Sequence, residues 1–327
     1  MRLKNINWGI IGCGNVTEKK SGPAFNKVEN SRLVSVMRRN GELSKDYAKR
    51  HNVPKWTDSA TDLINDKEVS AVYIATPPST HAKYAIEAMQ AGKPVYVEKP
   101  MAATYEECRE MIRVSEKTGV PLFVAYYRRS LPGFLKVKEI VESGVLGKPL
   151  FVSIRLTRPA NVEEKENKSW RINPDIAGGG IFYDLASHQL DFLDFLFGPI
   201  MDVSGFAYNK SGYYKAEDTV VASFMHENGV AGSGVWSFVT SDDSKSDVIE
   251  IVGTEGRLEF SCFGHTPLLL HKDNSVTEVS FEVPDNIQFY LIKQIVEELT
   301  TGKRCVSTGL SAARTNRVME LIVNRGI

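Results

Sequence analysis

Ile6-Asn-Trp-Gly-Ile-Ile-Gly12-Cys-Gly14-Asn-Val-Thr17 is a short apolar run that stops at a glycine-rich turn. A strand followed by Gly-x-Gly is the pattern of a dinucleotide site, in which the first glycine makes the tight turn and the second lets the backbone approach a pyrophosphate. Thr17 replaces the third glycine of that fingerprint, so an ordinary strand-to-helix turn fits the same residues. The candidates for contact with a cofactor are Gly12, Gly14, Asn15 and Val16.

The segments that follow alternate between strand and helix patterns. Apolar runs at 33–37, 69–76, 95–97 and 120–125 are separated by helical patterns at 43–51, 79–91 and 105–118. This alternation predicts an α/β fold, a Rossmann-type doubly wound parallel sheet with strand order 3-2-1-4-5-6 and right-handed crossovers. We therefore expect a dinucleotide-binding domain over residues 1–125.

Two positions at strand ends bear on the chemistry of this domain. Arg38 and Arg39 end the second strand, where NAD sites commonly place an acidic residue; adjacent arginines favour the 2′-phosphate of NADP(H) over NAD(H), although a solvated arginine pair fits equally. Lys99, in Glu98-Lys99-Pro100, follows a strand whose carboxyl end faces the ligand crevice. An ammonium there stabilises a developing alkoxide; the alternative is a solvated lysine before a helix.

A second motif lies in the other half of the chain. Three glycines, 178–180, precede an apolar helix on which Asp184, His188 and Asp191 are spaced i, i+4 and i+7 and share one stripe. An acid and an imidazole in apolar surroundings suit proton transfer. The same spacing also fits a buried polar cluster that only orients the helix.

The remainder of the chain predicts a second domain over residues 126–327. Many short alternating runs between 199 and 283 indicate a large, mainly antiparallel sheet with one buried face, and two helices follow at about 287–301 and 309–324. Residues 161–169 are polar and charged, typical of a mobile lid or of a solvated connection. The second face of a sheet of this size must also be buried by packing against another element or subunit.

Composition excludes several function classes. Forty basic residues balance forty acidic ones, so no nucleic acid or membrane surface is expected as a partner. No apolar run reaches the roughly 20 residues of a membrane helix, and the N-terminus lacks a signal-peptide pattern. The four cysteines are far apart and predict neither disulfides nor a metal site. A cytoplasmic location is expected.

Taken together, the motifs resemble the glucose–fructose oxidoreductase / inositol dehydrogenase / rhizopine-catabolism (Gfo/Idh/MocA) family. The resemblance extends from about residue 5 to about residue 325. The motifs that carry it are Gly12-x-Gly14, Ala75-Thr76-Pro77-Pro78-Ser79-x-His81, Glu98-Lys99-Pro100, Trp170-Arg171 and Gly178-Gly-Gly-x-x-x-Asp184-x-x-x-His188-x-x-Asp191.

The resemblance implies a nicotinamide cofactor, a carbohydrate or polyol substrate, and a homodimer or homotetramer assembled through the second sheet. Lys99, Asp184 and His188 match the catalytic positions, with His188 as general acid/base and Lys99 polarising the reacting oxygen. Further cofactor candidates are Thr76, Pro77, His81 and Glu98. Further substrate candidates are Tyr127, Arg129, Trp170 and Arg171.

The leading hypothesis is therefore an oxidoreductase that transfers a hydride between NADP(H), or less favourably NAD(H), and a sugar, polyol or related carbonyl compound. One alternative is a glycoside hydrolase that uses nicotinamide transiently, and another is a non-catalytic dinucleotide-binding regulator. The identity of the sugar and the reaction direction do not follow from the sequence.

Overall fold

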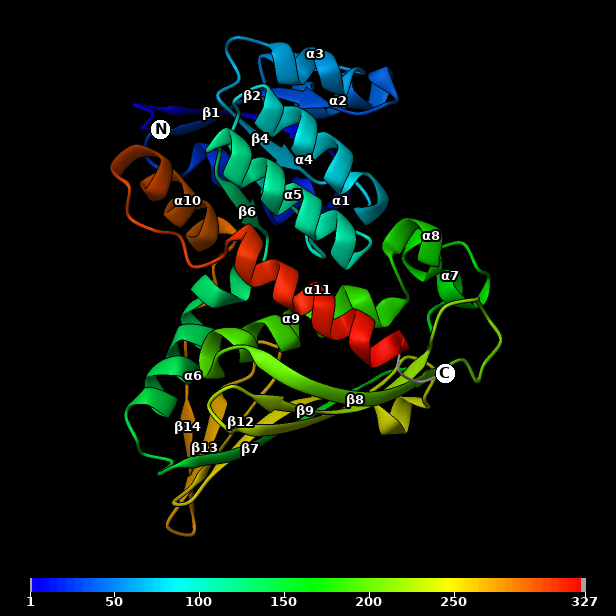
Figure 1. Ribbon diagram of the computed structural model, residues 1–327, viewed down its shortest axis with the longest axis vertical. Helices are drawn as coiled ribbons and strands as arrows, with labels where there is room; N and C mark the ends of the chain where they lie inside the picture. The colour runs from blue at the N-terminus through cyan, green and yellow to red at the C-terminus, as the bar shows by residue number, and fades with distance from the viewer. Residues whose placement is uncertain (1, 325–327) are drawn as a thin grey trace. The chain divides into compact units, whose positions relative to one another are not determined.

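The predicted parallel sheet is present in the computed structural model, which describes residues 2–324 of the chain (Figure 1). Its six strands lie in the order β3-β2-β1-β4-β5-β6 and pair in parallel, which confirms the expected Rossmann topology. The strands are β1 (Ile6–Ile11), β2 (Ser31–Met37), β3 (Lys55–Thr57), β4 (Ala71–Ile74), β5 (Val95–Val97) and β6 (Leu122–Val124).

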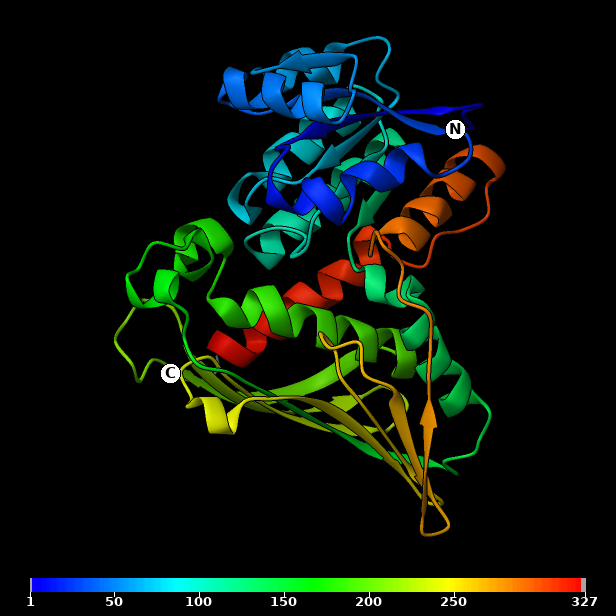
Figure 2. The ribbon, with the colours of Figure 1, turned by 180° about the vertical axis from the view of Figure 1, so that it is seen from behind.

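Helices pack on this sheet because parallel strands are apolar on both faces. On one side, α4 and α5 lie next to each other, and Figure 2 shows α1 and α10 on the other side. Thr104 and Glu107 form a capping box at the start of α5. The helices are α1 (Asn15–Lys19), α2 (Gly41–Arg50), α3 (Ala60–Asn65), α4 (His81–Gln90), α5 (Tyr105–Thr118) and α10 (Phe289–Thr301), with 3-10 turns η1 (Gly22–Asn26), η2 (Pro78–Thr80) and η3 (Tyr127–Ser130).

The second sheet has eight strands in the order β14-β13-β12-β11-β7-β10-β9-β8. All neighbours pair antiparallel except β7 and β10, so the prediction of a large, mainly antiparallel sheet is confirmed. The strands are β7 (Pro149–Thr157), β8 (Ile200–Tyr208), β9 (Thr219–His226), β10 (Ala231–Ser237), β11 (Ser246–Gly253), β12 (Arg257–Phe260), β13 (Leu268–Lys272) and β14 (Ser275–Val279).

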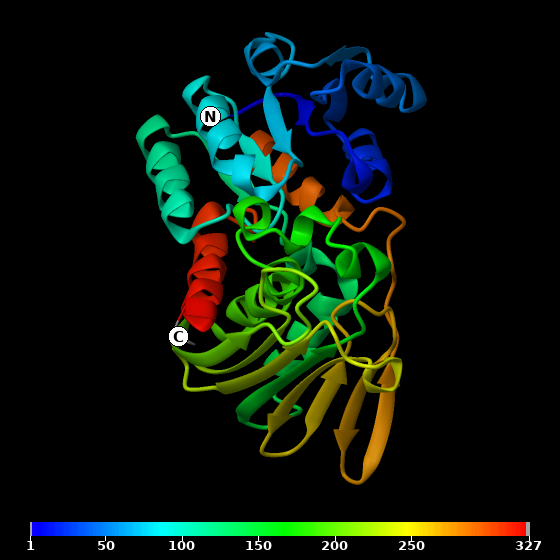
Figure 3. The same ribbon diagram turned by 90° about the vertical axis from the view of Figure 1, so that its right-hand side faces the viewer.

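One face of this sheet is covered by helices, as Figure 3 shows. The core between the two layers is formed by inward side chains of the central strands and by the apolar residues of α9, among them Phe182, Phe192 and Trp236. The elements outside the sheet are α6 (Pro132–Glu142), α7 (Val162–Lys165), η4 (Trp170–Ile172), α8 (Pro174–Ala177), α9 (Ile181–Phe197), η5 (Asp242–Ser244) and α11 (Gly309–Asn324).

The chain divides into two compact units that are not contiguous in sequence. The first contains residues 1–130 and 284–313, and the second contains 131–283 and 314–327. The predicted division after residue 125 differs from this in two ways. The break falls at 130/131, and a late segment that includes α10 returns to the first unit.

Candidate active site

The glycine-rich turn after β1 is closely packed. Gly12 has φ +93°, and a Cβ atom there would lie 2.9 Å from the backbone nitrogen of Thr76, so both conformation and space require glycine. Thr17, in the position of the third glycine, is buried, and its hydroxyl donates to the carbonyl of Gly14 at 2.8 Å. Asn15 and Val16 open α1, whose first N–H groups have no partner within the helix.

Basic side chains lie next to this turn, at the end of β2. Arg38 and Arg39 are exposed, whereas the Asn40 side chain is occupied in capping α2, accepting from the Leu43 N–H at 3.2 Å. Arg38 is close enough to Cys13 to act on its thiol electrostatically, opposing the burial that raises the pKa of that thiol.

The ends of β4 and β5 are held together by a histidine. His81 is fully buried, with Nε2 2.7 Å from the carbonyl oxygen of Thr76 and Nδ1 3.0 Å from that of Pro100. His81 therefore connects the segment after β4 to the segment after β5. Lys99, between buried Glu98 and Pro100, keeps a partly exposed side chain.

In the second unit, the three glycines 178–180 let the start of α9 pack closely against the segment that contains Glu217. A Cβ atom on Gly180 would lie 2.7 Å from the carbonyl oxygen of Glu217. Four residues further along, the partly exposed Asp184 carboxylate pairs with Arg171 at 3.2 Å, and the Arg171 guanidinium lies over the Trp170 ring, 4.6 Å from its centroid. The structure therefore brings three predicted site residues together: Trp170, Arg171 and Asp184.

His188 lies one turn beyond Asp184 on α9. It is 3% exposed and makes an edge contact with Phe263, with ring centroids 6.0 Å apart. Asp191, the third member of the predicted stripe, is fully buried and accepts from the Thr315 hydroxyl of α11 at 3.4 Å. Asp191 is thus tied to α11, while Asp184 is bound to Arg171.

Three other predicted features have defined local surroundings. Tyr127 and Arg129 are buried in η3, where Arg129 donates to the carbonyl of Val306 at 3.3 Å. Within residues 161–169, the structure has a short helix, α7 (Val162–Lys165), in which buried Glu164 receives a bidentate ion pair from Arg158 at 2.6 and 2.8 Å. Most other side chains of this segment are exposed, as a solvated connection would have them.

Glu217, just before β9, contacts the start of α9, and no sequence pattern indicated this contact. Its Oε1 accepts from the Gly180 N–H at 2.8 Å, 37 residues away in sequence. Burial raises its pKa from 4.5 to about 7, and the Gly180 hydrogen bond opposes that shift only in part. The carboxyl group that contacts the start of α9 thus has a raised pKa.

This raised pKa predicts a pH-dependent gain of stability in Glu217→Gln. A folded-state pKa above the unfolded value stabilises the protein at low pH, and that stability is lost as the pH rises through about 7. Glutamine keeps the acceptor for Gly180 without the charge. We expect denaturant unfolding to show Glu217→Gln more stable than wild type by about 2–3 kcal/mol at about pH 8.5, and nearly equal at about pH 5. Exposed Glu227→Gln is the control; equal stability of Glu217→Gln and wild type at both pH values would contradict the assignment.

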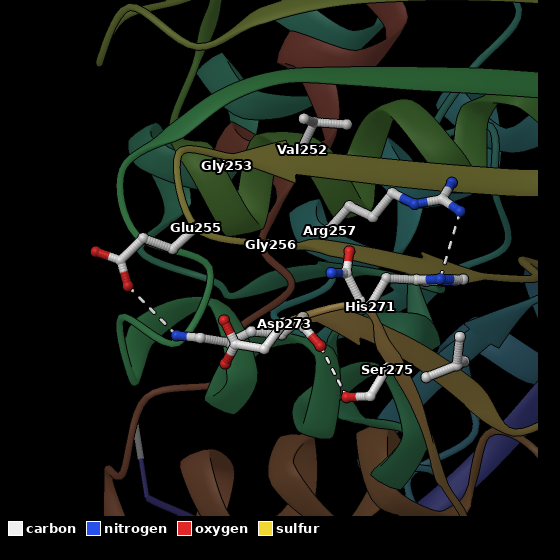
Figure 4. Close-up of a pocket in the computed structure, with 11 residues that line it drawn as sticks. Val252, Gly253, Glu255, Gly256, Arg257, His271, Asp273 and Ser275 are labelled. Carbon is white, nitrogen blue, oxygen red and sulfur yellow. Dashed lines mark hydrogen bonds and ion pairs between the residues drawn. The ribbon is translucent and has the colours of Figure 1, made fainter.

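A shallow hollow lies away from these residues, at the β11–β12 and β13–β14 turns (Figure 4). Two of its charged groups are ion-paired, Arg257 with Glu250 and Lys272 with Glu255. Within residues 2–324, no cluster of three histidine, cysteine or acidic side chains is placed to hold a metal ion. Over the same range, every helix is too short or too polar to cross a membrane.

A Rossmann unit of this topology joined to a second α/β unit is an architecture found in nicotinamide-dependent oxidoreductases. The chain belongs to the Gfo/Idh/MocA family: residues 6–126 match the model of the oxidoreductase family with NAD-binding Rossmann fold, and residues 134–259 match that of the GFO/IDH/MocA C-terminal domain. Oxidoreductase P35 of Formosa agariphila is 41% identical over 297 residues, covering 89% of this chain and 90% of the relative.

Other similar proteins are more distant. The 1,5-anhydro-D-fructose reductase of Ensifer adhaerens is 27% identical, over 77% of this chain and 74% of that protein. The scyllo-inositol 2-dehydrogenase (NAD(+)) of Bacillus subtilis is 25% identical, over 93% and 87%. A solved structure of levoglucosan dehydrogenase in complex with NADH has the same fold, with a TM-score of 0.90 at 22% identity over 98% and 97% of the two chains.

Proposed function

We propose that the protein transfers a hydride between a nicotinamide cofactor and the carbinol or carbonyl carbon of a sugar or polyol. The observation that carries this proposal is the Asp184–His188 pair on α9, in a chain whose Rossmann unit presents Lys99 at the end of β5. The names of the relatives, which include a sugar reductase and an inositol dehydrogenase, support the substrate class.

Each residue has a role that its surroundings suit. A bound nicotinamide would supply the hydride chemistry, and the Gly12–Val16 turn of the Rossmann unit would hold the pyrophosphate of that cofactor. In the oxidative direction, His188 would accept the proton of the substrate hydroxyl at Nε2 or Nδ1. Lys99 stabilises the oxygen during this change. Asp184 and Arg171 orient the substrate, and the half-exposed Trp170 ring offers an apolar wall to a sugar.

The test is a turnover assay of the purified protein with NADPH, NADP, NADH and NAD against a panel of sugars, polyols and keto-sugars. We expect absorbance at the nicotinamide band to change stoichiometrically with at least one substrate. Hydrolysis of a glycoside without net cofactor change would instead identify a hydrolase, and cofactor binding with no turnover of any compound would favour a regulator. Neither alternative has support from the relatives.

We further propose NADP(H) as the preferred cofactor, on the basis of Arg38 and Arg39. Both side chains are exposed at the end of β2, and Asn40, used as a helix cap, leaves no carboxylate at this position for a ribose 2′-hydroxyl. In Arg38→Ala/Arg39→Ala, fluorescence titration is expected to show NADPH affinity reduced about 10- to 100-fold and NADH affinity little changed. Arg32→Ala, an exposed arginine on the same strand, is the control. Equal losses for both cofactors would contradict the preference.

The second sheet supports the proposal of a homodimer. Exposed apolar residues run from the edge strand β8, where Phe206 is 67% and Met201 53% exposed, to Val221 on β9 and Val235 on β10, which are 38% and 39% exposed. Such a patch marks an interaction surface. Phe206→Glu is expected to convert a dimer into a monomer in analytical ultracentrifugation. Val276→Glu, at a 57% exposed site on the opposite edge strand β14, should leave the assembly intact. A wild-type monomer would refute this arrangement.

A further inference from the structure

A chain of buried polar groups lies in the first unit, immediately before Lys99. Glu98 Oε1 accepts from the Tyr73 hydroxyl at 2.5 Å and from Gln288 Nε2 at 2.6 Å, and Gln288 Oε1 accepts from the Tyr96 hydroxyl at 2.7 Å. Glu98 is 7% exposed and the other three residues are fully buried. A carboxylate so far from water depends on such donors.

The direction of each hydrogen bond is fixed by the chemistry of its partners. A carboxylate only accepts, so the Gln288 amide group must turn its NH₂ toward Glu98, and its oxygen then receives the Tyr96 hydroxyl. Burial raises the pKa of both tyrosines well above the usual value, with the charge of Glu98 adding to the shift, so both keep their protons as donors. The network is therefore polarised toward Glu98.

Gln288 reaches this network from the segment that returns to the first unit late in the chain. Its backbone N–H donates to the carbonyl of Lys20 at 3.2 Å, and the Asn286 side chain donates to that of Lys19 at 2.6 Å. Two anchors thus fix the residue just before α10. The Rossmann strands supply Tyr73, Tyr96 and Glu98, and the returning segment completes their hydrogen bonding.

The network ends at the proposed catalytic lysine. The second oxygen of Glu98, Oε2, lies 3.3 Å from the Lys99 backbone nitrogen, which donates to it. The Glu98 carboxylate therefore holds the main chain of Lys99 on one side while Tyr73 and Gln288 hold the carboxylate on the other. The strand end cannot shift without breaking a charge-assisted hydrogen bond.

We propose that Gln288 is a positioning residue for the reaction: it holds Glu98, and through Glu98 it sets the place of Lys99. This inference rests on the proposed function. Tyr73 acts in parallel with Gln288, since both donate to the same oxygen, whereas Tyr96 supports Gln288 without touching Glu98. The ionisable groups around Glu98 are Tyr73 on β4, Tyr96 on β5 and His81 on α4.

The experiment compares Gln288→Leu, Tyr73→Phe and Tyr96→Phe for kcat, KM and cofactor affinity. Gln288→Leu and Tyr73→Phe each remove one hydrogen-bond donor to Glu98. We expect kcat to fall about tenfold or more in both, with KM and cofactor affinity little changed. Tyr96→Phe leaves both donors, so its kcat should follow wild type. Gln288→His, which restores a donor, should recover part of kcat.

Two outcomes overturn the proposal, and they are distinguishable. If wild type turns over a sugar and Gln288→Leu has a lower melting temperature but the wild-type kcat and KM, Gln288 is only structural. If wild type binds NADPH or NADH but reduces or oxidises nothing in the panel, the proposed function itself fails, and the positioning role fails with it.

Discussion

His188→Ala is expected to reduce kcat about 10²- to 10⁴-fold, the usual contribution of a positioned acid/base group. The imidazole is 3% exposed on α9, where its proton is shielded from bulk water. Lys99→Met should reduce kcat by about 10²- to 10³-fold, because the apolar side chain cannot stabilise charge on the reacting oxygen. Steady-state assays measure kcat, and fluorescence titration measures the affinity for the cofactor.

Cofactor affinity is the property that both variants should retain. His188 belongs to the second unit and is not part of the Rossmann fold, so His188→Ala should bind NADPH with the wild-type dissociation constant. Exposed His265→Ala and Lys117→Met are matched controls with unchanged kcat. Full turnover in His188→Ala and in Lys99→Met would remove both residues from the catalytic roles given to them.

The sequence predicted the architecture well because local patterns determine most of it. The order of the six parallel strands followed from alternating elements, and α5 and α11 occupy the expected ranges. The return of residues 284–313 to the first unit was not predictable in this way. An amphipathic helix such as α10 shows which residues it buries but not which unit receives them.

The candidate site was predicted less completely, because local patterns do not show contacts between distant segments. Asp184 and His188 are close in sequence, so helical spacing identified them. Asp191 shares that spacing, yet its partner on α11, Thr315, is 124 residues away. Glu217 and Gln288 meet their partners across 37 and 190 residues. Spacing identifies residues on one face of one helix, whereas hydrogen bonds between distant segments need the fold.

Removal of Arg314 is expected to cause a large loss of stability. Arg314, on α11, donates from Nη2 and Nε to the two oxygens of Asp194 at 2.6 and 2.8 Å. Asp194 lies on the catalytic helix α9 and its side chain is 3% exposed, whereas that of Arg314 is 43% exposed. Arg314→Met leaves a buried carboxylate without its guanidinium, so the free energy of unfolding should fall by about 3 kcal/mol in urea denaturation.

Substitution of the other partner, Asp194, should reduce the free energy of unfolding much less. This difference between the two variants is the stronger test. In Asp194→Asn, the partly exposed guanidinium turns into water and an uncharged amide of similar shape fills the buried position, so we expect a loss of about 1 kcal/mol. In Arg314→Met/Asp194→Asn no buried charge is left, and the double variant should be more stable than Arg314→Met alone. A double variant less stable than either single one would place the energy in the packing of α11 on α9 rather than in the charge of Asp194.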